Sequence, residues 1–326
     1  MGIKTVLSKS DFIKLLSGYS LGELVRFEPI ITGTVQTNYY LETTTGRYIL
    51  RYYECRSEAS VKFEVNLLNY LRKRDYPCPA VYKDKHGRYV NPHNGKPYVL
   101  FEFIQGTHIE NPSVEQQKQL IKLVAKLHKL TRNYRPSYRT ARWNYGVNLC
   151  KELAYQKAKE INTINSWKKL KWLEDELEKL QLPKSLPKGI CHCDFHFSNI
   201  LFEDGEIQAI LDFDDANYTY LLLDLAFLIE PFIPEFKWNS WQSFGKTDSI
   251  LDFTSARETV AEYMKHRQLN NNEIRHLFDV YKLSVLIDCL WYFERGKAED
   301  FYEKRKIDAL NRFGRDSFFR EIFDEN

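Results

Sequence analysis

The chain has 326 residues, enough for two lobes, since single hydrophobic cores usually stop growing near roughly 250–300 residues. Its 47 basic and 44 acidic residues give a formal net charge of +3, too small to indicate binding to nucleic acid or to an anionic membrane surface. The six cysteines include no C-x-x-C pair, no stretch approaches roughly 18 apolar residues, and the N-terminus lacks a signal-peptide pattern. We therefore expect a cytoplasmic protein with a small-molecule partner.

The first hundred residues predict a sheet. Residues 8–17 read as a short helix, because Ser8 precedes apolar residues at helical spacing. The segments 25–31, 37–42 and 47–53 have the composition and turn signals of three antiparallel strands. A further pair of strands is predicted at 88–90 and 96–104, separated by a turn at 92–95, which completes a five-stranded lobe.

One main helix interrupts these strands. Val61, Val65 and Leu68 follow the i, i+4, i+7 rhythm of an amphipathic helix, and Pro77 and Pro79 prevent it from continuing. The rest of the chain is predicted to be mostly helical.

Two helical stretches follow in chain order. A capping box from Ser113 to Gln116 starts a helix that runs to about His128. Residues 149–180 are mainly helical, with Ser166 as the expected cap. Between them, residues 131–148 mix arginines, Arg142 among them, with aromatic residues. This stretch either recognises a carboxylate or phosphate or forms a solvated loop, and both interpretations stay open.

The motif that indicates chemistry is H-x-D-x-x-x-x-N, formed by His192, Asp194 and Asn199, with Asp212 after a short hairpin. Phosphoryl transfer needs a carboxylate that orients the attacking hydroxyl, and Mg²⁺ prefers hard oxygen ligands. Asp194 is the candidate for the first task, and Asn199 with Asp212 for the second. A strand ending at Cys193, an Asp204-Gly205 turn and a strand at 207–213 support the interpretation.

Residues 188–216, with the later Asp224-Leu225-Ala226, resemble the aminoglycoside phosphotransferase and choline kinase superfamily, relatives of the protein kinases. The resemblance implies an α+β, bilobal, protein-kinase-like fold: a nucleotide-binding lobe over residues 1–103, with a five-stranded antiparallel sheet and one main helix, and a mostly helical lobe over 104–326 that carries the catalytic hairpin. It also implies ATP, Mg²⁺ and a small hydroxylated acceptor. Asp224 would brace the catalytic loop.

The resemblance further implies a set of nucleotide-binding residues, all but the last in the first lobe: Gly33, Asn38, Arg51, Glu64, Glu102 and Ile104. Arg51 stands where protein kinases have the lysine that grips the phosphates, and Glu64 where their helix glutamate pairs with it. Backbone groups of Glu102 and Ile104 would bind adenine. The alternatives are an ordinary hairpin loop around Gly33, a surface strand arginine and a solvated glutamate.

The acceptor is indicated only in outline. Residues 37–40 and 76–79 are most similar to the type II homoserine kinases, so homoserine, a hydroxyl compound that also bears an amine, is the first candidate. Asp214 and Asp215 either attract a cationic acceptor, which would favour an aminoglycoside or an amino alcohol such as choline, or are exposed turn residues. The segment that starts at Glu230 either lines the acceptor pocket or packs within the helical lobe. A kinase-like protein that binds nucleotide without transferring phosphate is the remaining alternative. Oligomeric state is not indicated.

Overall fold

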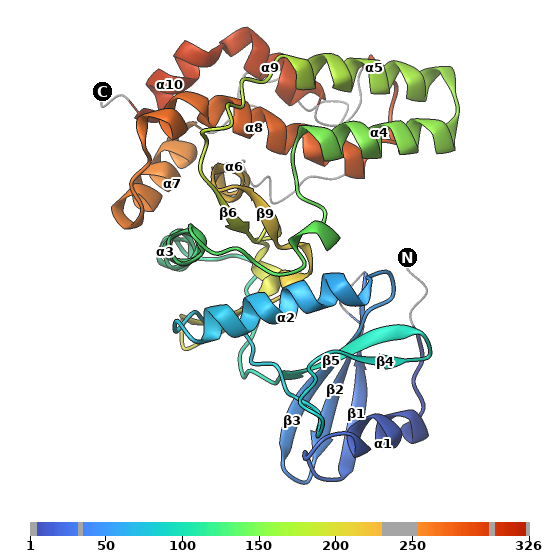
Figure 1. Ribbon diagram of the computed structural model, residues 1–326. Helices are drawn as coiled ribbons and strands as arrows, with labels where there is room; N and C mark the ends of the chain where they lie inside the picture. The colour runs from blue at the N-terminus through green and yellow to red at the C-terminus, as the bar shows by residue number, and fades with distance from the viewer. Residues whose placement is uncertain (1–4, 32–34, 230–252, 300–303, 324–326) are drawn as a thin grey trace. The chain divides into compact units, whose positions relative to one another are not determined.

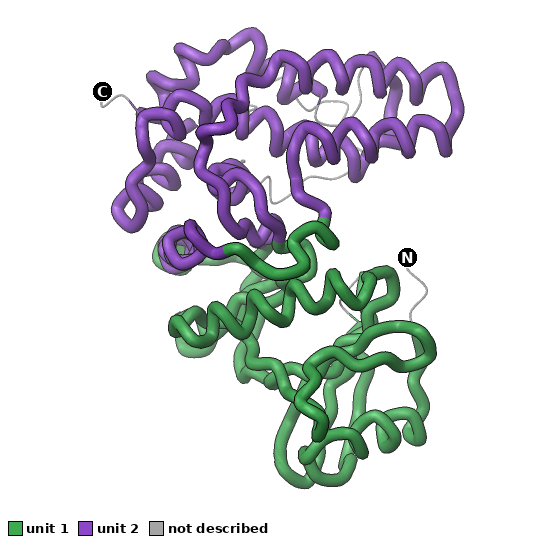
Figure 2. Tube along the Cα trace, viewed as in Figure 1, with its two compact units in different colours: residues 1–116, 135–142, 196–216 green, residues 117–134, 143–195, 217–326 purple. Residues whose placement is uncertain are grey.

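The computed structural model describes residues 5–31, 35–229, 253–299 and 304–323. The chain divides into two compact units that alternate along the sequence (Figure 2). Unit 1 contains residues 1–116, 135–142 and 196–216, and unit 2 contains residues 117–134, 143–195 and 217–326. The expected lobe boundary between residues 103 and 104 remains a prediction, because these units are not continuous stretches of chain.

Unit 1 is built on a five-stranded antiparallel sheet, as predicted (Figure 1). In the order β1-β2-β3-β5-β4, the strands are β1 (Leu24–Ile30), β2 (Thr37–Thr43), β3 (Gly46–Tyr52), β5 (Lys96–Glu102) and β4 (Asn91–His93). The prediction of a strand at 88–90 was wrong. The strand begins at Asn91 and includes Pro92, which is tolerated there because β4 is an edge strand and a missing N–H leaves no ladder bond unmade.

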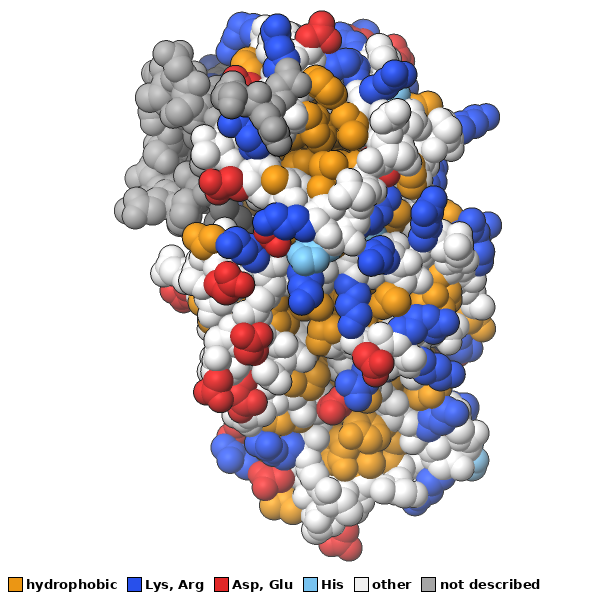
Figure 3. Space-filling model, turned by 90° about the vertical axis from the view of Figure 1, so that its left-hand side faces the viewer, with side chains coloured by type: hydrophobic (Ala, Val, Ile, Leu, Met, Phe, Trp, Pro, Cys, Tyr) orange, Lys and Arg blue, Asp and Glu red, His pale blue; other side chains and the backbone are white. Residues whose placement is uncertain are grey.

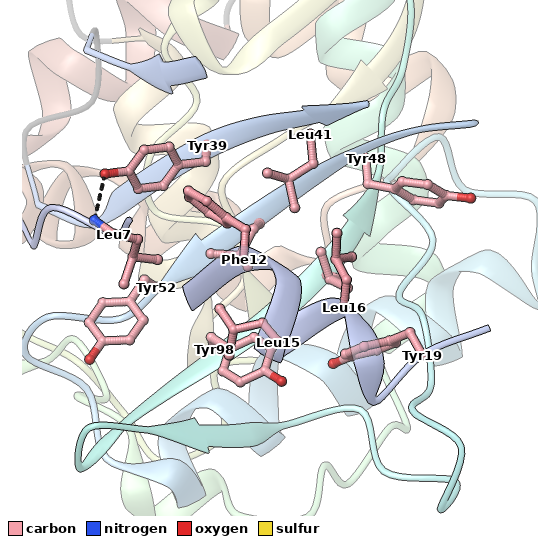
Figure 4. Close-up of a cluster of buried hydrophobic side chains, with 12 residues drawn as sticks. Leu7, Phe12, Leu15, Leu16, Tyr19, Tyr39, Leu41, Tyr48, Tyr52 and Tyr98 are labelled. Carbon is pink, nitrogen blue, oxygen red and sulfur yellow. Dashed lines mark hydrogen bonds between the residues drawn. The ribbon is translucent and has the colours of Figure 1, made fainter. Parts of the chain in front are cut away.

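A short helix covers one face of this sheet. Helix α1 (Lys9–Ser17) starts at Ser8, whose side chain accepts a hydrogen bond from the Asp11 amide, as the sequence predicted. Its buried residues Phe12, Leu15 and Leu16 pack against the side chains that β2, β3 and β5 direct to this face (Figure 4). The Leu7 amide, just before the helix, donates a 3.1 Å hydrogen bond to the Tyr39 hydroxyl.

The other face of the sheet carries the polar residues of interest. Because side chains alternate along a strand, Leu50 points to the α1 side and its neighbour Arg51 to the opposite side. Helix α2 (Glu58–Arg72) brings Glu64 to this second face, where it pairs with Arg51. The alternation therefore separates an apolar core from a charged surface.

Unit 1 also includes a hairpin from much later in the chain. It consists of β7 (Ile200–Glu203) and β8 (Glu206–Ile210), flanked by the short 3-10 helices η2 (Phe197–Asn199) and η3 (Phe213–Asp215). Asp204 and Gly205 form its tip with φ angles of 51° and 83°, which matches the predicted two-residue turn. A further 3-10 turn, η1 (Arg139–Ala141), belongs to the same unit.

Unit 2 is mostly helical, as expected. Its helices are α3 (Val114–Thr131), α4 (Val147–Ile161), α5 (Ile164–Glu178), α6 (Leu222–Ile229), α7 (Phe253–His266), α8 (Asn271–Trp291), α9 (Lys304–Phe313) and α10 (Arg315–Phe323), with a two-stranded sheet of β6 (Lys188–Cys191) and β9 (Asn217–Tyr220). The predicted capping box at Ser113 and Gln116 is present. Ser166 was wrongly predicted as a cap: Thr163 is the N-cap of α5, and Ser166 is the reciprocal partner three residues later.

The surface drawn in Figure 3 carries both signs of charge. Lys, Arg, Asp and Glu side chains occur on this face, with hydrophobic side chains exposed between them (Figure 3). Among the described residues, no helix is both long and apolar enough to cross a membrane.

Candidate active site

The two predicted metal ligands lie at the same end of the β7–β8 hairpin. Ile200 pairs with Ile210, and the Leu211 amide donates a 2.7 Å hydrogen bond to the Asn199 carbonyl. The antiparallel register thus brings the residue before β7 next to the residues that follow β8. Asn199 and Asp212 are neighbours in space because the Asp204-Gly205 turn and a register shift between Leu201 and Phe202 together set this pairing.

Asp212 has an unusual backbone conformation, with φ 60° and ψ 61°. The left-handed region costs an L-residue about 1–2 kcal/mol, so the surrounding structure must hold it there. The residue begins the turn of η3, which also carries Asp214 and Asp215. A strained residue in this place marks the turn as a candidate for function.

Arg56 holds the two carboxylates that follow. Its Nε and Nη2 donate hydrogen bonds of 2.9 Å each to the Asp214 carboxylate, and Nη2 also donates to Asp215 at 3.0 Å. The Gln36 side-chain amide donates a further bond of 2.8 Å to Asp214. Burial alone would raise the pKa of Asp214, but the hydrogen bonds and charge of Arg56 outweigh it and lower the pKa. Asp214 is therefore an ionised, buried anion within unit 1.

Arg51 connects the sheet to the turn. Its Nη1 lies 2.8 Å from Asp212 Oδ1, and its Nε donates a 3.1 Å hydrogen bond to Asn38 Oδ1. The arginine side chain is 14% exposed and the Asp212 side chain 38% exposed. Burial works against the charge of the guanidinium, but Asp212 and other nearby groups outweigh it and raise the pKa of Arg51. Arg51 is a fixed cation beside a candidate metal ligand.

Glu64 completes this cluster from helix α2. Its side chain is 2% exposed, its Oε1 lies 3.5 Å from Arg51 Nη1, and its Oε2 accepts a 2.9 Å hydrogen bond from the Tyr53 hydroxyl. Burial raises the pKa of Glu64 to about 7, and Arg51 opposes the shift. The arginine and glutamate that the resemblance paired are an ion pair in the structure.

An apolar shelf lies on the same face of the sheet. Tyr40 is opposite Ile49 across β2 and β3, and its ring meets Phe103 edge-on at 5.4 Å. Phe101 belongs to the same face and carries the Arg51 guanidinium 5.7 Å above its ring. Phe101 is buried, whereas Tyr40, Ile49 and Phe103 are partly exposed. Partly exposed apolar side chains beside a cation provide a stacking surface for a flat ring that carries a charged group.

The two residues whose backbone is predicted to bind adenine, Glu102 and Ile104, come just after Phe101 in the chain. The Glu102 amide donates to the Ala80 carbonyl at 2.9 Å, and the Glu102 carboxylate accepts from the Ala80 amide at 3.0 Å. Ile104 lies just beyond β5 and is partly exposed. Their part in binding adenine remains a prediction.

The loop that carries Asp194 belongs to unit 2. The boundary between the units falls within it, between Phe195 and His196. Buried His192 stacks on Phe195 at 4.4 Å, and its Nδ1 accepts a 3.3 Å hydrogen bond from the Asp194 amide. Asp194 is partly exposed on this loop. The hydrogen bond to His192 helps to hold the loop backbone in place.

Asp224, at the start of α6, anchors the same loop. Its carboxylate accepts hydrogen bonds of 2.9 Å from both the His192 and the Cys193 amides. His128 Nε2 lies 3.0 Å from Asp224 Oδ2, and its Nδ1 lies 2.6 Å from the Tyr263 hydroxyl. Burial opposes a charge on His128, but Tyr263 and Asp224 outweigh it and raise its pKa well above the usual value. The expected brace is present, with a buried histidine added to it.

Some functional candidates lie outside the described residues, and others were not foreseen. Gly33 and Glu230 fall in segments that the structure does not describe. Sequence analysis missed Gln36, Tyr53 and Arg56, and it weighed Arg142 only as part of an arginine-rich stretch. Gln36 and Asp214 are 178 residues apart in the chain, so no local pattern could have paired them.

Comparison with known proteins identifies a family and several relatives of this chain. The model of the phosphotransferase enzyme family (APH) matches residues 26–258. The homoserine kinase of Rhodospirillum rubrum is 29% identical over 314 residues, covering 95% of this chain and 89% of that protein. The homoserine kinase of Methylobacillus flagellatus is 26% identical over 275 residues, covering 84% and 81%.

Solved structures share the fold. A microcompartment-associated aminopropanol kinase aligns with a TM-score of 0.60 at 16% identity, over 96% of this chain and 95% of that one. The spectinomycin phosphotransferase APH(9)-Ia, in complex with ADP and spectinomycin, aligns with a TM-score of 0.62 at 14% identity, over 98% and 96%.

The chain belongs to the phosphotransferase enzyme family. Its sheet, its hairpin with two candidate metal ligands and its braced loop resemble the parts that phosphoryl transfer uses. The protein is a small-molecule kinase, a phosphotransferase with an alcohol group as acceptor.

Proposed function

We propose that this enzyme transfers the γ-phosphoryl group of ATP to the hydroxyl of homoserine and that it requires Mg²⁺. The observation that carries the proposal is a cluster in unit 1. In it Arg51 contacts Asp212, a candidate metal ligand, and the amide of the preceding Leu211 donates a hydrogen bond to the Asn199 carbonyl. Nucleotide phosphates and a metal ion need such a combination of fixed cation and hard oxygen ligands.

The donor set fits magnesium. Asp212 offers a carboxylate and Asn199 an amide oxygen, and both residues are partly exposed at the hairpin end. Mg²⁺ keeps several waters and needs only one or two protein ligands beside the phosphate oxygens. When bound, the ion would neutralise charge on the β- and γ-phosphates.

The residues of the chain divide the remaining work. Arg51 would hold the nucleotide phosphates, with Glu64 and Asn38 fixing its direction. The shelf of Tyr40, Ile49 and Phe101 would stack on adenine. Asp194 would accept the proton of the acceptor hydroxyl. The hydroxyl oxygen would form the new bond to the γ-phosphorus while the bond between that phosphorus and the departing ADP breaks.

Homoserine is favoured over a polycationic acceptor by two observations. The homoserine kinases match most of the chain, at 25–29% identity. Asp214 and Asp215, the acidic pair considered for an aminoglycoside, are both ion-paired with Arg56, so a cationic acceptor would have to compete with that arginine. Glu230 stays a prediction, and we assign it no role.

A panel of acceptors tests the proposal. ATP consumption would be measured with L-homoserine, 1-amino-2-propanol, choline, methylthioribose and spectinomycin, and the product identified by phosphorus NMR. We expect turnover with homoserine, and a loss of roughly 10²- to 10⁴-fold in Asp194→Ala with nucleotide binding retained. Turnover with another acceptor but not homoserine would reject the acceptor, and wild-type turnover by Asp194→Ala would reject its catalytic role.

A further inference from the structure

Arg142 is a buried arginine whose side chain is used inside unit 1. It is 8% exposed and ends the short η1 segment, far in sequence from the hairpin and from helix α2. Its Nε donates a 3.0 Å hydrogen bond to the Ala216 carbonyl, and its Nη2 a 2.8 Å bond to the Phe213 carbonyl. One guanidinium therefore joins both ends of the η3 turn.

The same side chain is fixed to helix α2. Its Nη1 donates a 2.8 Å hydrogen bond to Ser60 Oγ, and the guanidinium lies 4.8 Å above the ring of Phe63. The turn is thus tied to a rigid helix through a planar group with a fixed fork of donors. A flexible lysine ammonium could not reach both carbonyls and Ser60 in one plane.

The η3 turn needs this support because of where it begins. Asp212 stands directly before it in the left-handed conformation, and Phe213 and Ala216 are the residues whose carbonyls Arg142 holds. Arg56 acts on the side chains of the same turn, through Asp214 and Asp215. Arg142 acts on the backbone of the turn, at the carbonyl of Phe213 directly after Asp212, and its Nη1 also lies 3.9 Å from Asp214 Oδ1.

We propose that Arg142 is a positioning residue for the metal-binding carboxylate: by clamping the carbonyls of Phe213 and Ala216 to helix α2, it presets the direction of Asp212. The inference rests on the proposed function, in which Asp212 binds the metal ion. This role argues against substrate recognition by Arg142, since its guanidinium donates hydrogen bonds to the Phe213 and Ala216 carbonyls and to Ser60.

Metal binding can be measured without turnover. Mn²⁺, a paramagnetic substitute for Mg²⁺, would be titrated into enzyme saturated with a non-hydrolysable ATP analogue, and free Mn²⁺ followed by electron paramagnetic resonance. Nucleotide affinity without metal would be measured in parallel by calorimetry. The variants are Arg142→Lys, Arg142→Gln, Ser60→Ala and Asp212→Asn. Arg267→Lys serves as the control, because Arg267 is an arginine of unit 2 whose side chain is 10% exposed and pairs with Glu273.

We expect Arg142→Lys and Arg142→Gln to bind Mn²⁺ roughly 10-fold more weakly, as loss of groups that orient a metal ligand usually does. Metal-free nucleotide affinity should stay unchanged, and Arg267→Lys should match the wild type in both measurements. A merely structural arginine would not change the metal affinity alone.

Three results would overturn the inference. If both Arg142 variants bind Mn²⁺ like the wild type while Asp212→Asn does not, the positioning role is wrong and the metal site stands. If Asp212→Asn binds normally, the metal site itself is wrong and the positioning role falls with it. If circular dichroism shows that the Arg142 variants are unfolded, Ser60→Ala decides: we expect roughly 2- to 5-fold weaker Mn²⁺ binding from the lost hydrogen bond, and unchanged binding rejects the role.

Discussion

The Tyr53 hydroxyl donates a 2.9 Å hydrogen bond to Glu64 Oε2, and both side chains are buried. The other oxygen of this carboxylate, Glu64 Oε1, lies 3.5 Å from Arg51 Nη1. Tyr53 therefore supplies the donor that a buried glutamate needs when it is ionised, and it fixes the direction of the carboxylate that pairs with Arg51, for which we propose a role in phosphate binding.

Removing this hydroxyl should destabilise the protein in a pH-dependent way. The pKa of Glu64 is raised to about 7, so the carboxylate is charged at pH 8 and mostly protonated at pH 5. Hydrogen bonds to charged groups contribute about 1.5–3 kcal/mol and neutral ones about 0.5–1.5 kcal/mol. Urea denaturation of Tyr53→Phe should show the larger loss at pH 8. The exposed Tyr155→Phe should lie within about 0.5 kcal/mol of the wild type at both pH values. Equal losses at both would contradict the ionisation of Glu64.

Replacing Arg51 by lysine should weaken nucleotide binding. The guanidinium reaches Asn38 with one nitrogen and Asp212 with another, and an ammonium cannot hold both in this fork. We expect KM for ATP to rise roughly 10-fold in Arg51→Lys, with a smaller change in kcat. Initial rates at varied ATP would test this, with Arg26→Lys on exposed β1 as the control. A lysine variant with unchanged KM would show that point charge alone suffices.

Asp224→Asn should be strongly destabilising. The asparagine lacks the negative charge that helps to raise the pKa of His128, and it presents only one oxygen to the two loop amides. Breaking a buried pair in this way costs about 3–5 kcal/mol. Guanidinium denaturation measures the loss. The exposed Asp175→Asn, which also removes an ion pair, should cost about 0–1 kcal/mol. Similar losses in the two variants would argue against a charged His128.

Glu54 should contribute stability that disappears in acid. Burial alone would raise its pKa, but hydrogen bonds from Lys96, Thr37 and Thr5 outweigh it and lower the pKa to about 2. A carboxyl group with a lowered pKa stabilises the folded state above its unfolded pKa and loses that effect as pH falls through its folded pKa. The shift corresponds to about 3 kcal/mol at most.

Denaturation of Glu54→Gln from pH 7 to pH 2.5 tests this. The free energy of unfolding should be lower than that of the wild type by about 2–3 kcal/mol at pH 7, and the difference should shrink steadily between pH 4.5 and pH 2.5. Exposed Glu203→Gln should show no such trend. A constant difference across the range would mean that Glu54 acts through packing.

Sequence reasoning predicted the parts of the site that follow local rules. The Asp204-Gly205 turn predicted the hairpin, and the hairpin register places Asn199 beside Asp212. Strand alternation similarly separates Arg51 from the apolar face. Pro92 misled the prediction of β4, because a proline on an edge strand looks the same in the sequence as one in a turn.

The residues that hold the η3 turn in place could not be predicted from the sequence, for a physical reason. Gln36, Arg56 and Arg142 reach the η3 turn from segments between 71 and 178 residues away, and such contacts follow from the folded topology. An arginine on a loop has the same local signature whether it meets solvent or a buried carbonyl. Only the burial of Arg142 separates these cases.

The alternation of the two compact units along the chain bears on how the protein is made. Unit 1 receives its last segment, residues 196–216, only after residues 117–134 and 143–195 of unit 2 have been synthesised. Synthesis must therefore proceed to residue 216 before the sheet can meet the hairpin that carries Asn199 and Asp212. Until then the N-terminal sheet lacks the last segment of its unit, and contacts between residues so distant in sequence form slowly.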